Sequence, residues 1–153
     1  MLHVVLFQPE IPHNTGAIGR LCLAAGARLH LIQPLGFSLD DKNLRRAGLD
    51  YWQEVDVRLW ESWQALHAGI NHGTPVYFIE CMGEAAHWDA DLSQTETYLV
   101  FGPETRSLPE SIVDPATCLR IPMKGTRSLN LATAAGIVMY EALRQRARAG
   151  IVS

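Results

Sequence analysis

The sequence lacks the features that would place a protein in a membrane or an oxidising compartment. No stretch approaches the roughly 20 consecutive apolar residues of a transmembrane helix. The apolar segment Leu2–Phe7 is too short for a signal-peptide core and has no basic flank. The three cysteines, Cys22, Cys81 and Cys118, are widely spaced and form no metal-binding pattern. We therefore expect a cytoplasmic protein with reduced thiols and no membrane association.

Several catalytic motifs are also missing. The chain has no Gly-x-Gly-x-x-Gly turn, no P-loop, no His-Glu-x-x-His and no Gly-x-Ser-x-Gly. Its histidines show no ligand spacing beside carboxylates, so we expect no metal. The net charge of −3 argues against a broad basic surface for nucleic acid, so RNA binding would need local patches. Candidate patches are Lys42, Arg45 and Arg46, then Lys124 and Arg127, and then Arg144, Arg146 and Arg148.

What the sequence does contain is an alternation of strand-like and helix-like segments in a chain that is 48% hydrophobic. This alternation predicts an α/β fold, a mostly parallel sheet with helices on both faces, in a single domain spanning 1–153. We expect strands at 2–7, 28–33, 54–59, 75–80, 97–101 and 118–121. We expect helices at 14–25, capped by Asn14, at 41–48, 61–68 and 109–113, and from about Ser128 to Ala149.

The last predicted helix is apolar nearly all the way round between Leu129 and Leu143. A helix without a polar face is buried on several sides, and one sheet of a small domain cannot cover all of it. The sequence therefore predicts a homodimer in which a second subunit covers the remainder. A central helix in a monomer is the alternative.

Two polar clusters lie near predicted strand ends, where open α/β sheets bind ligands. In the first, 14–20, N-capping would explain Asn14, whereas the guanidinium of Arg20 could hold a phosphate or a ribose. A plain surface arginine is the alternative. The second is Gly102-Pro103-Glu104-Thr105-Arg106. Its glycine lets a ligand approach closely, and Glu104 accepts hydrogen bonds from the ligand or fixes Arg20. The alternative is a tight turn with a solvated acid.

The third cluster joins Ile121-Pro122-Met123 to Ser128-Leu129-Asn130 across the basic loop 124–127. Backbone groups around Ile121 and Met123 could read an adenine edge. Ser128 and Asn130 lie at the start of the following helix, where hydrogen-bond donors converge on polar or anionic groups. Alternatively, Ser128 simply caps the helix and Asn130 bonds to the loop.

In order and spacing, the three clusters resemble the three motifs of the SPOUT superfamily of RNA methyltransferases. The similarity is greatest to minimal single-domain members that 2'-O-methylate the tRNA wobble nucleotide, and it includes 8–16 and 44–51. The resemblance implies a C-terminal trefoil knot, S-adenosylmethionine as methyl donor, a homodimer, and the wobble pyrimidine of the tRNA anticodon stem-loop as substrate. Alternatives are a non-catalytic RNA-binding or adenosyl-binding module and a ribosomal-RNA 2'-O-methyltransferase.

The resemblance also implies roles for individual residues. It places the methyl donor against Ile79, Gly102, Ile121, Met123, Ser128 and Leu129. It places Arg20 and Glu104 beside the reacting ribose, organised by Asn14 and Asn130, and puts Tyr140 at the dimer interface. The resemblance also implies that Arg20 acts as the base that takes the ribose proton. Because a guanidinium stays protonated at neutral pH, Arg20 could equally stabilise the developing alkoxide or clamp a phosphate. The chain departs from the family pattern at Ser107, where glycine is usual, and at Ala17, where asparagine is common.

Overall fold

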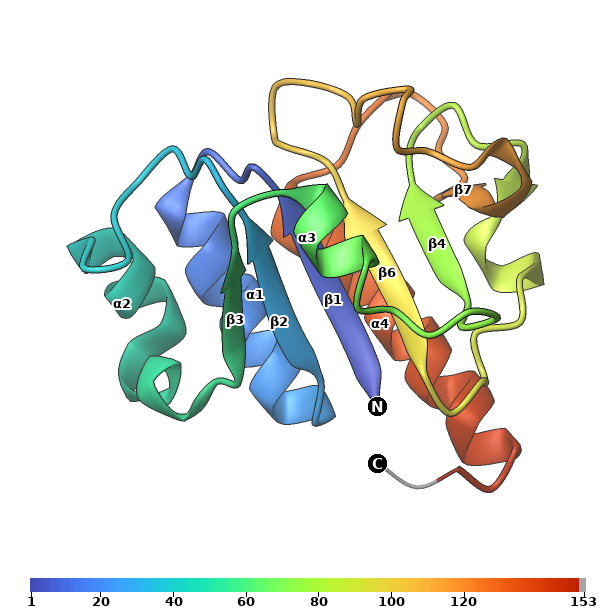
Figure 1. Cartoon of the computed structure of the whole chain (residues 1–153), viewed down its shortest axis with the longest axis horizontal. Coiled ribbons are helices and arrows are strands. Elements are labelled where there is room, and N and C mark those ends of the chain that lie inside the picture. Colours follow the sequence, from blue (N-terminus) through green and yellow to red (C-terminus); the bar gives the residue numbers. More distant parts are fainter. Residues whose placement is uncertain (152–153) are drawn as a thin grey trace.

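The computed structural model describes residues 1–151, apart from the side chain of Asp50. It contains a seven-stranded sheet in the order β3-β2-β1-β6-β4-β7-β5. All neighbouring strands pair in parallel, which confirms the predicted sheet type. The strands are β1 Leu2–Phe7, β2 Arg28–Ile32, β3 Val57–Trp60, β4 Val76–Ile79, β5 Ala85–Ala86, β6 Thr97–Phe101 and β7 Cys118–Arg120. Strands β1 and β6, far apart in sequence, lie side by side at the centre (Figure 1).

Helices cover both faces of the sheet, as predicted (Figure 1). The α-helices are α1 Pro12–Ala25, α2 Lys42–Gly48, α3 Trp63–His67 and α4 Leu131–Arg148. Three short 3-10 helices are η1 Leu49–Glu54, η2 His87–Asp89 and η3 Pro115–Thr117. Helices α1 and α4 pack on one face, with α2 outside α1, whereas α3 packs on the other. Among the described residues, no helix combines the length and apolarity needed to cross a bilayer.

The central strand β1 contributes side chains to two hydrophobic cores, one on each face of the sheet. All its residues are buried, as expected for a strand covered on both faces. Successive side chains alternate between faces. Val4 and Leu6 join the core under α1 and α4, whereas Val5 and Phe7 join the core under α3.

Helix α1 begins earlier than predicted. Pro12 suits the first helical turn, and Ile11 at the N-cap position contributes no side-chain hydrogen bond. Asn14 lies inside the helix and is buried, so its interpretation as the N-cap is wrong. Gly26 ends the helix with a φ of 66°, a conformation that favours glycine.

Other boundaries also differ from the predictions. Helix α4 begins at Leu131 and is capped by Asn130, so neither the predicted start near Ser128 nor the Ser128 cap holds. The predicted helix at 109–113 is a turn closed by a 3.1 Å hydrogen bond from Ile112 N to Pro109 O. The strand predicted at 54–59 shifts to β3 because η1 takes up the chain through Glu54.

Helix α4 leaves part of its apolar surface uncovered. Val138 and Met139 are fully buried against the sheet, whereas Ile137 is 38% and Tyr140 49% exposed. These two exposed residues are three apart, so they share one helix face. A single chain therefore does not bury the whole apolar helix.

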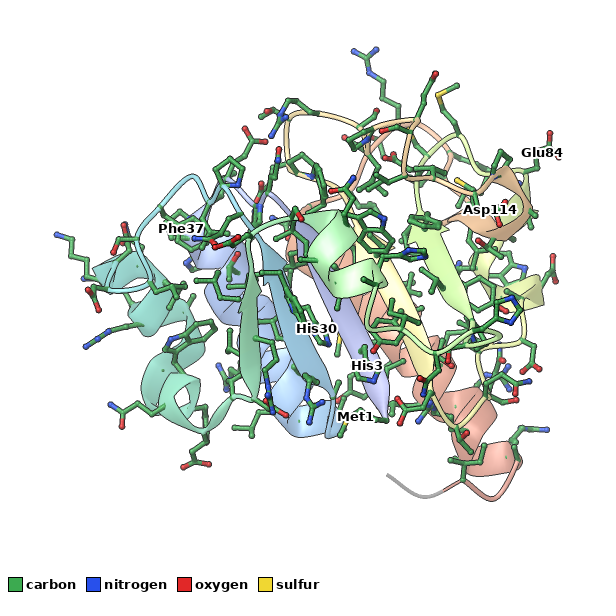
Figure 2. All side chains as sticks on the ribbon, in the orientation of Figure 1. Met1, His3, His30, Phe37, Glu84 and Asp114 are labelled. Carbon is green, nitrogen blue, oxygen red and sulfur yellow. The ribbon has the colours of Figure 1, made fainter. Side chains whose placement is uncertain are left out.

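Two buried histidines form a line of hydrogen bonds on the α3 face of the sheet. His3 Nδ1 lies 2.9 Å from His30 Nε2, and His3 Nε2 lies 2.6 Å from the Glu96 carboxylate. Trp60 Nε1 donates to His30 Nδ1 at 2.9 Å, and Tyr98 stacks on His3. Figure 2 shows His3 and His30 on the neighbouring strands β1 and β2. This pair lies outside the cavity described below.

Candidate functional site

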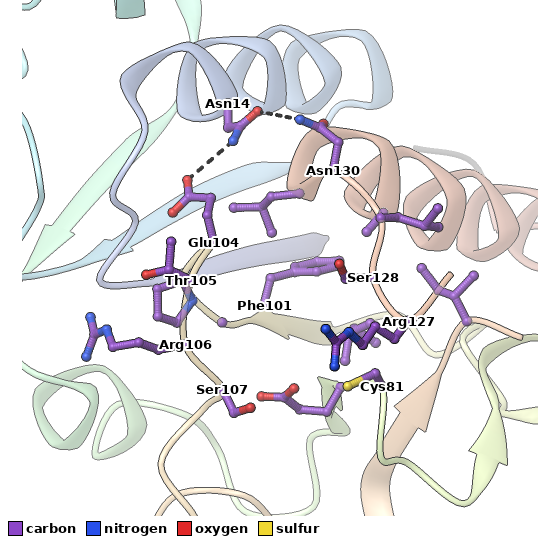
Figure 3. A pocket seen from close by; sticks show the side chains of 18 of the residues that line it. Asn14, Cys81, Phe101, Glu104, Thr105, Arg106, Ser107, Arg127, Ser128 and Asn130 are labelled. Carbon is purple, nitrogen blue, oxygen red and sulfur yellow. Dashed lines mark hydrogen bonds between the residues drawn. The ribbon is translucent and has the colours of Figure 1, made fainter. Parts of the chain in front are cut away.

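A cavity of about 530 Å³ opens at the carboxyl ends of β4, β6 and β7. Its walls come from the ends of these strands, from the loop after β6, from the segment between β7 and α4, and from the first residues of α1 and α4 (Figure 3). All the residues that the resemblance assigned to the methyl donor line it: Ile79, Gly102, Ile121, Met123, Ser128 and Leu129. These six residues therefore lie around one cavity, and their contact with a methyl donor stays a prediction.

Glu104 ties the loop after β6 to the start of α1. Its carboxylate accepts hydrogen bonds from the backbone N–H of Glu10 at 2.7 Å and of Ile11 at 3.1 Å. The Glu10 carboxylate in turn accepts from the backbone N–H of Thr105 at 2.9 Å and from its hydroxyl at 2.8 Å. These hydrogen bonds from Thr105 lower the pKa of Glu10. The α1 N-terminus has no side-chain cap of its own, so the Glu104 carboxylate stabilises it from the opposite loop.

Asn14 and Asn130 extend this network across the cavity. Asn14 Nδ2 donates to Glu104 at 3.5 Å, and Asn130 Nδ2 donates to Asn14 Oδ1 at 3.0 Å. Asn130 Oδ1 accepts from the backbone N–H of Thr133 at 3.1 Å and so caps α4. Figure 3 shows Glu104, Asn14 and Asn130 in a row at one side of the cavity. One hydrogen-bonded chain therefore joins the three polar clusters found in the sequence.

Among the four predicted catalytic residues, Arg20 is the one that does not line the cavity of its own chain. It is exposed on α1, with its guanidinium carbon 5.6 Å from the centre of the Tyr51 ring. The six residues from Asn14 to Arg20 turn a helix by about 600°, so the two side chains leave α1 in different directions. The expectation that Glu104 fixes Arg20 is wrong, because Glu104 bonds to Glu10, Ile11 and Asn14.

The predicted basic patches have different surroundings. Lys42, Arg45 and Arg46 are exposed on α2, which is capped by Asp41. Lys124 and Arg127 are exposed in the loop before α4, and Arg127 also lines the cavity.

The basic patch predicted on α4 includes one residue, Arg146, that is not at the surface. Arg146 is only 3% exposed and donates to backbone carbonyls, including that of Thr95 at 3.1 Å. Arg144 is exposed but forms hydrogen bonds with Glu141 at 2.8 and 2.9 Å. Its neighbour therefore offsets the charge of Arg144.

The sequence reasoning missed one charged residue of the cavity wall, Glu80, although it had singled out Arg106 and Ser107, which also line the cavity. Arg106 donates to Gln8 Oε1 at 3.2 Å. Glu80 directly follows β4, and its Oε1 accepts a hydrogen bond from the backbone N–H of Leu108. Burial raises the pKa of Glu80. Its position just after a buried strand was the available signal, because parallel strands bring their carboxyl ends to one edge.

The side chains of the cavity are suited to binding and orienting a ligand and less suited to nucleophilic attack on it. Apolar walls from Ile79, Ile121 and Leu129 face polar groups on the side of Asn14 and Glu104. Among the side chains that the structure describes, no three of His, Cys, Asp or Glu are grouped to hold a metal ion. Such a cavity suits a ligand with a flat apolar part and polar ends.

Comparisons with known proteins agree with this geometry. The sequence model of the SpoU rRNA Methylase family matches residues 1–140. A tRNA (cytidine(34)-2'-O)-methyltransferase of Methylovorus glucosotrophus (strain SIP3-4) is 47% identical over 156 residues, which cover 99% of this chain and 100% of that protein. A solved structure described as giving structural insights into the 2-OH methylation of C/U34 on tRNA superposes with a TM-score of 0.91. It is 48% identical, and the match covers 97% of each chain.

A more distant structure is the AdoMet-bound rRNA methyltransferase of Sinorhizobium meliloti. It is 25% identical, with a TM-score of 0.84, and the match covers 99% of this chain but 57% of that one. The family match spans most of the sequence, and the relatives at 47–48% identity span it almost completely. The chain belongs to the SpoU methylase family of RNA methyltransferases.

Proposed function

We propose that this protein transfers a methyl group from S-adenosylmethionine to the ribose 2'-hydroxyl of the cytidine or uridine at tRNA position 34. The observation that carries the proposal is the single cavity at which all three polar clusters meet, joined by Glu104, Asn14 and Asn130. The near full-length relatives support tRNA position 34 as the substrate site. The rRNA methyltransferase neighbour is less similar and much longer, so we favour tRNA over ribosomal RNA.

The residues of the cavity fit an adenosyl donor. Apolar side chains of Ile79, Ile121 and Leu129 provide walls for an adenine, and the strand ends offer backbone groups to its edge. When bound, S-adenosylmethionine supplies a methyl group that an oxygen nucleophile can take from sulfur. Such a displacement depends mainly on alignment of the reacting groups. Hydrogen bonds among Glu104, Asn14 and Asn130 connect the loop after β6 with α1 and α4. They would fix the relative positions of these elements around the place where ribose and donor meet.

We also propose that the protein acts as a cytoplasmic homodimer. The exposed Ile137 and Tyr140 on α4 supply the apolar surface that a second copy would cover. Arg20 lies outside the cavity of its own chain, so we place its guanidinium at the RNA bound to the partner's cavity. There it would clamp a phosphate or stabilise the developing alkoxide. The exposed basic residues Lys42, Arg45, Arg46, Lys124 and Arg127 would contact the anticodon stem-loop.

We retain the trefoil knot as part of the proposal. Two glycines in the connections around β7 have conformations that suit tight packing or a turn. A Cβ on Gly102 would lie 3.2 Å from Leu108 Cγ, and Gly125 has a φ of 81°. In a knotted chain, the segment before α4 would pass through the loop that follows β6.

The proposal is tested by mapping the product. Purified protein is incubated with tritiated S-adenosylmethionine and total tRNA from cells that lack the position-34 methylation, and the labelled nucleotide is identified by mass spectrometry. We expect label on the 2'-oxygen of nucleotide 34. Label elsewhere in tRNA, or only in ribosomal RNA, would refute the substrate. Binding of the donor without any labelled RNA would favour a non-catalytic module.

A further inference from the structure

Glu80 presents a carboxylate to the cavity that none of the roles above uses. It is half-buried immediately after β4 and lines the same cavity as Ile79. Its Oε1 accepts the backbone N–H of Leu108, which fixes the orientation of the carboxylate. Within residues 1–151, no donor bonds to its Oε2, and no cationic side chain lies within ion-pair distance.

This environment favours a ligand that brings hydrogen-bond donors. The free oxygen is reachable from the cavity and is not among the buried atoms without a partner, so an O–H or N–H of a bound ligand can donate to it directly. Two arginines line the cavity, Arg106 and Arg127. Arg106 donates to Gln8, and neither arginine forms an ion pair with Glu80. A ligand donor is therefore the natural partner for the free oxygen of Glu80.

The place of Glu80 in the cavity indicates which part of an adenosyl ligand it meets. Figure 3 shows Cys81, the residue after Glu80, across the cavity from Asn14 and Asn130. The target ribose of the RNA is proposed to lie on the side of Asn14 and Glu104, so the reactive sulfur must point that way. The nucleoside part of the ligand is then left on the side of Glu80. Carboxylates at strand ends recognise ribose hydroxyls in other nucleotide sites by this pairing.

We propose that the free oxygen of Glu80 accepts hydrogen bonds from the ribose hydroxyls of the adenosyl ligand. This inference rests on the proposed function, because it needs an adenosyl ligand in the cavity. It makes Glu80 a specificity residue for the donor and assigns it no part in methyl transfer. The hydrogen bond from Leu108 then keeps the carboxylate aligned with the ligand.

The test measures binding alone, by isothermal titration calorimetry. The ligands are S-adenosylmethionine, S-adenosylhomocysteine, and the 2'-deoxy and 3'-deoxy analogues of S-adenosylhomocysteine. Glu80→Gln keeps an oxygen for the Leu108 N–H and replaces the free oxygen with an amide NH2. Glu84→Gln is the control, because Glu84 is exposed and lies at the edge of the molecule (Figure 2). Circular dichroism and thermal melting check that each variant is folded.

We expect wild type and Glu84→Gln to bind at least one deoxy analogue about tenfold more weakly than S-adenosylhomocysteine. We expect Glu80→Gln to bind S-adenosylhomocysteine about tenfold more weakly and to lose most of that discrimination. Unchanged discrimination in a folded Glu80→Gln would overturn the role of Glu80 and leave the proposed function intact. A loss confined to S-adenosylmethionine, which carries the positive sulfonium, would replace hydroxyl recognition with charge recognition. If wild type bound no adenosyl ligand at all, the donor assignment would fail as well.

Discussion

Lowering the pH should destabilise this protein through its buried histidine pair. Trp60 can only donate, so the Nδ1 of His30 must accept and carry no proton. His30 Nε2 then donates to His3 Nδ1, and His3 Nε2 donates to Glu96. Both rings are therefore neutral in the intact line. An added proton on either ring would turn an acceptor into a donor and break a hydrogen bond.

The sign and size of the effect follow from the pKa values. Burial lowers the pKa of His30 to about 3, and it also lowers the pKa of His3. An unfolded histidine binds a proton below about pH 6.5, whereas the folded His30 does not. The stability that this group contributes is complete above about pH 6.5 and falls by about 1.4 kcal/mol per pH unit below it. Between about pH 6.5 and 5, His30 alone should therefore cost about 2 kcal/mol of unfolding free energy.

The assay is urea unfolding at one protein concentration, at several pH values from about 7.5 to 5. We expect the wild-type free energy of unfolding to fall by about 2 kcal/mol or more over this range. His30→Gln should show a shallower dependence, and His67→Gln, which removes an exposed histidine, should follow wild type. A flat wild-type profile, or an equal loss of slope in His67→Gln, would refute the reasoning.

Three further predictions concern the site and the interface. Asn14→Ala breaks the link between Glu104 and Asn130, so kcat/KM for tRNA should fall about 10-fold or more. An unchanged value, equal to that of the exposed control Asn71→Ala, would contradict this. Arg20→Ala should reduce methyl transfer at least about 100-fold while binding of S-adenosylhomocysteine persists. Full activity, as we expect for Arg58→Ala, would remove Arg20 from the mechanism. Tyr140→Glu places a charge on the proposed interface and should give a monomeric mass by light scattering. A variant that stays dimeric, or a monomeric wild type, would exclude this use of α4.

The strands of the central sheet were predictable because their signal is local. Residues 2–7 and 97–101 are short, nearly continuous apolar runs, and both are buried in adjacent parallel strands. The place of the cavity was also predictable, since its walls include loops that directly follow such strands. Short elements near 54–60 and 109–113 were misplaced because their few residues carry little periodicity. There the tertiary contacts decide between strand, turn and 3-10 helix.

The side-chain partners at the site could not be predicted in the same way. Asn14 looked like an N-cap, because asparagine before an apolar run commonly is one. Its actual partners are Glu104 and Asn130, which lie 90 and 116 residues away. Glu80 was missed because a single acid after a strand has no distinctive spacing. Arg20 was assigned to the cavity by resemblance, and only the direction in which it leaves α1 shows that it lies elsewhere.

These long-range contacts couple the cavity to the surface of α1. The start of α1 is stabilised by Glu104, a residue of the loop that also forms the cavity wall. Asn130 caps α4 and also donates a hydrogen bond to Asn14 in α1, so it helps to hold α1 in place. A ligand that orders the loop after β6 would therefore also fix α1, and with it the exposed Arg20. Loss of Asn14 should consequently weaken transfer to RNA more than binding of the donor. That difference separates a positioning network from a set of donor contacts.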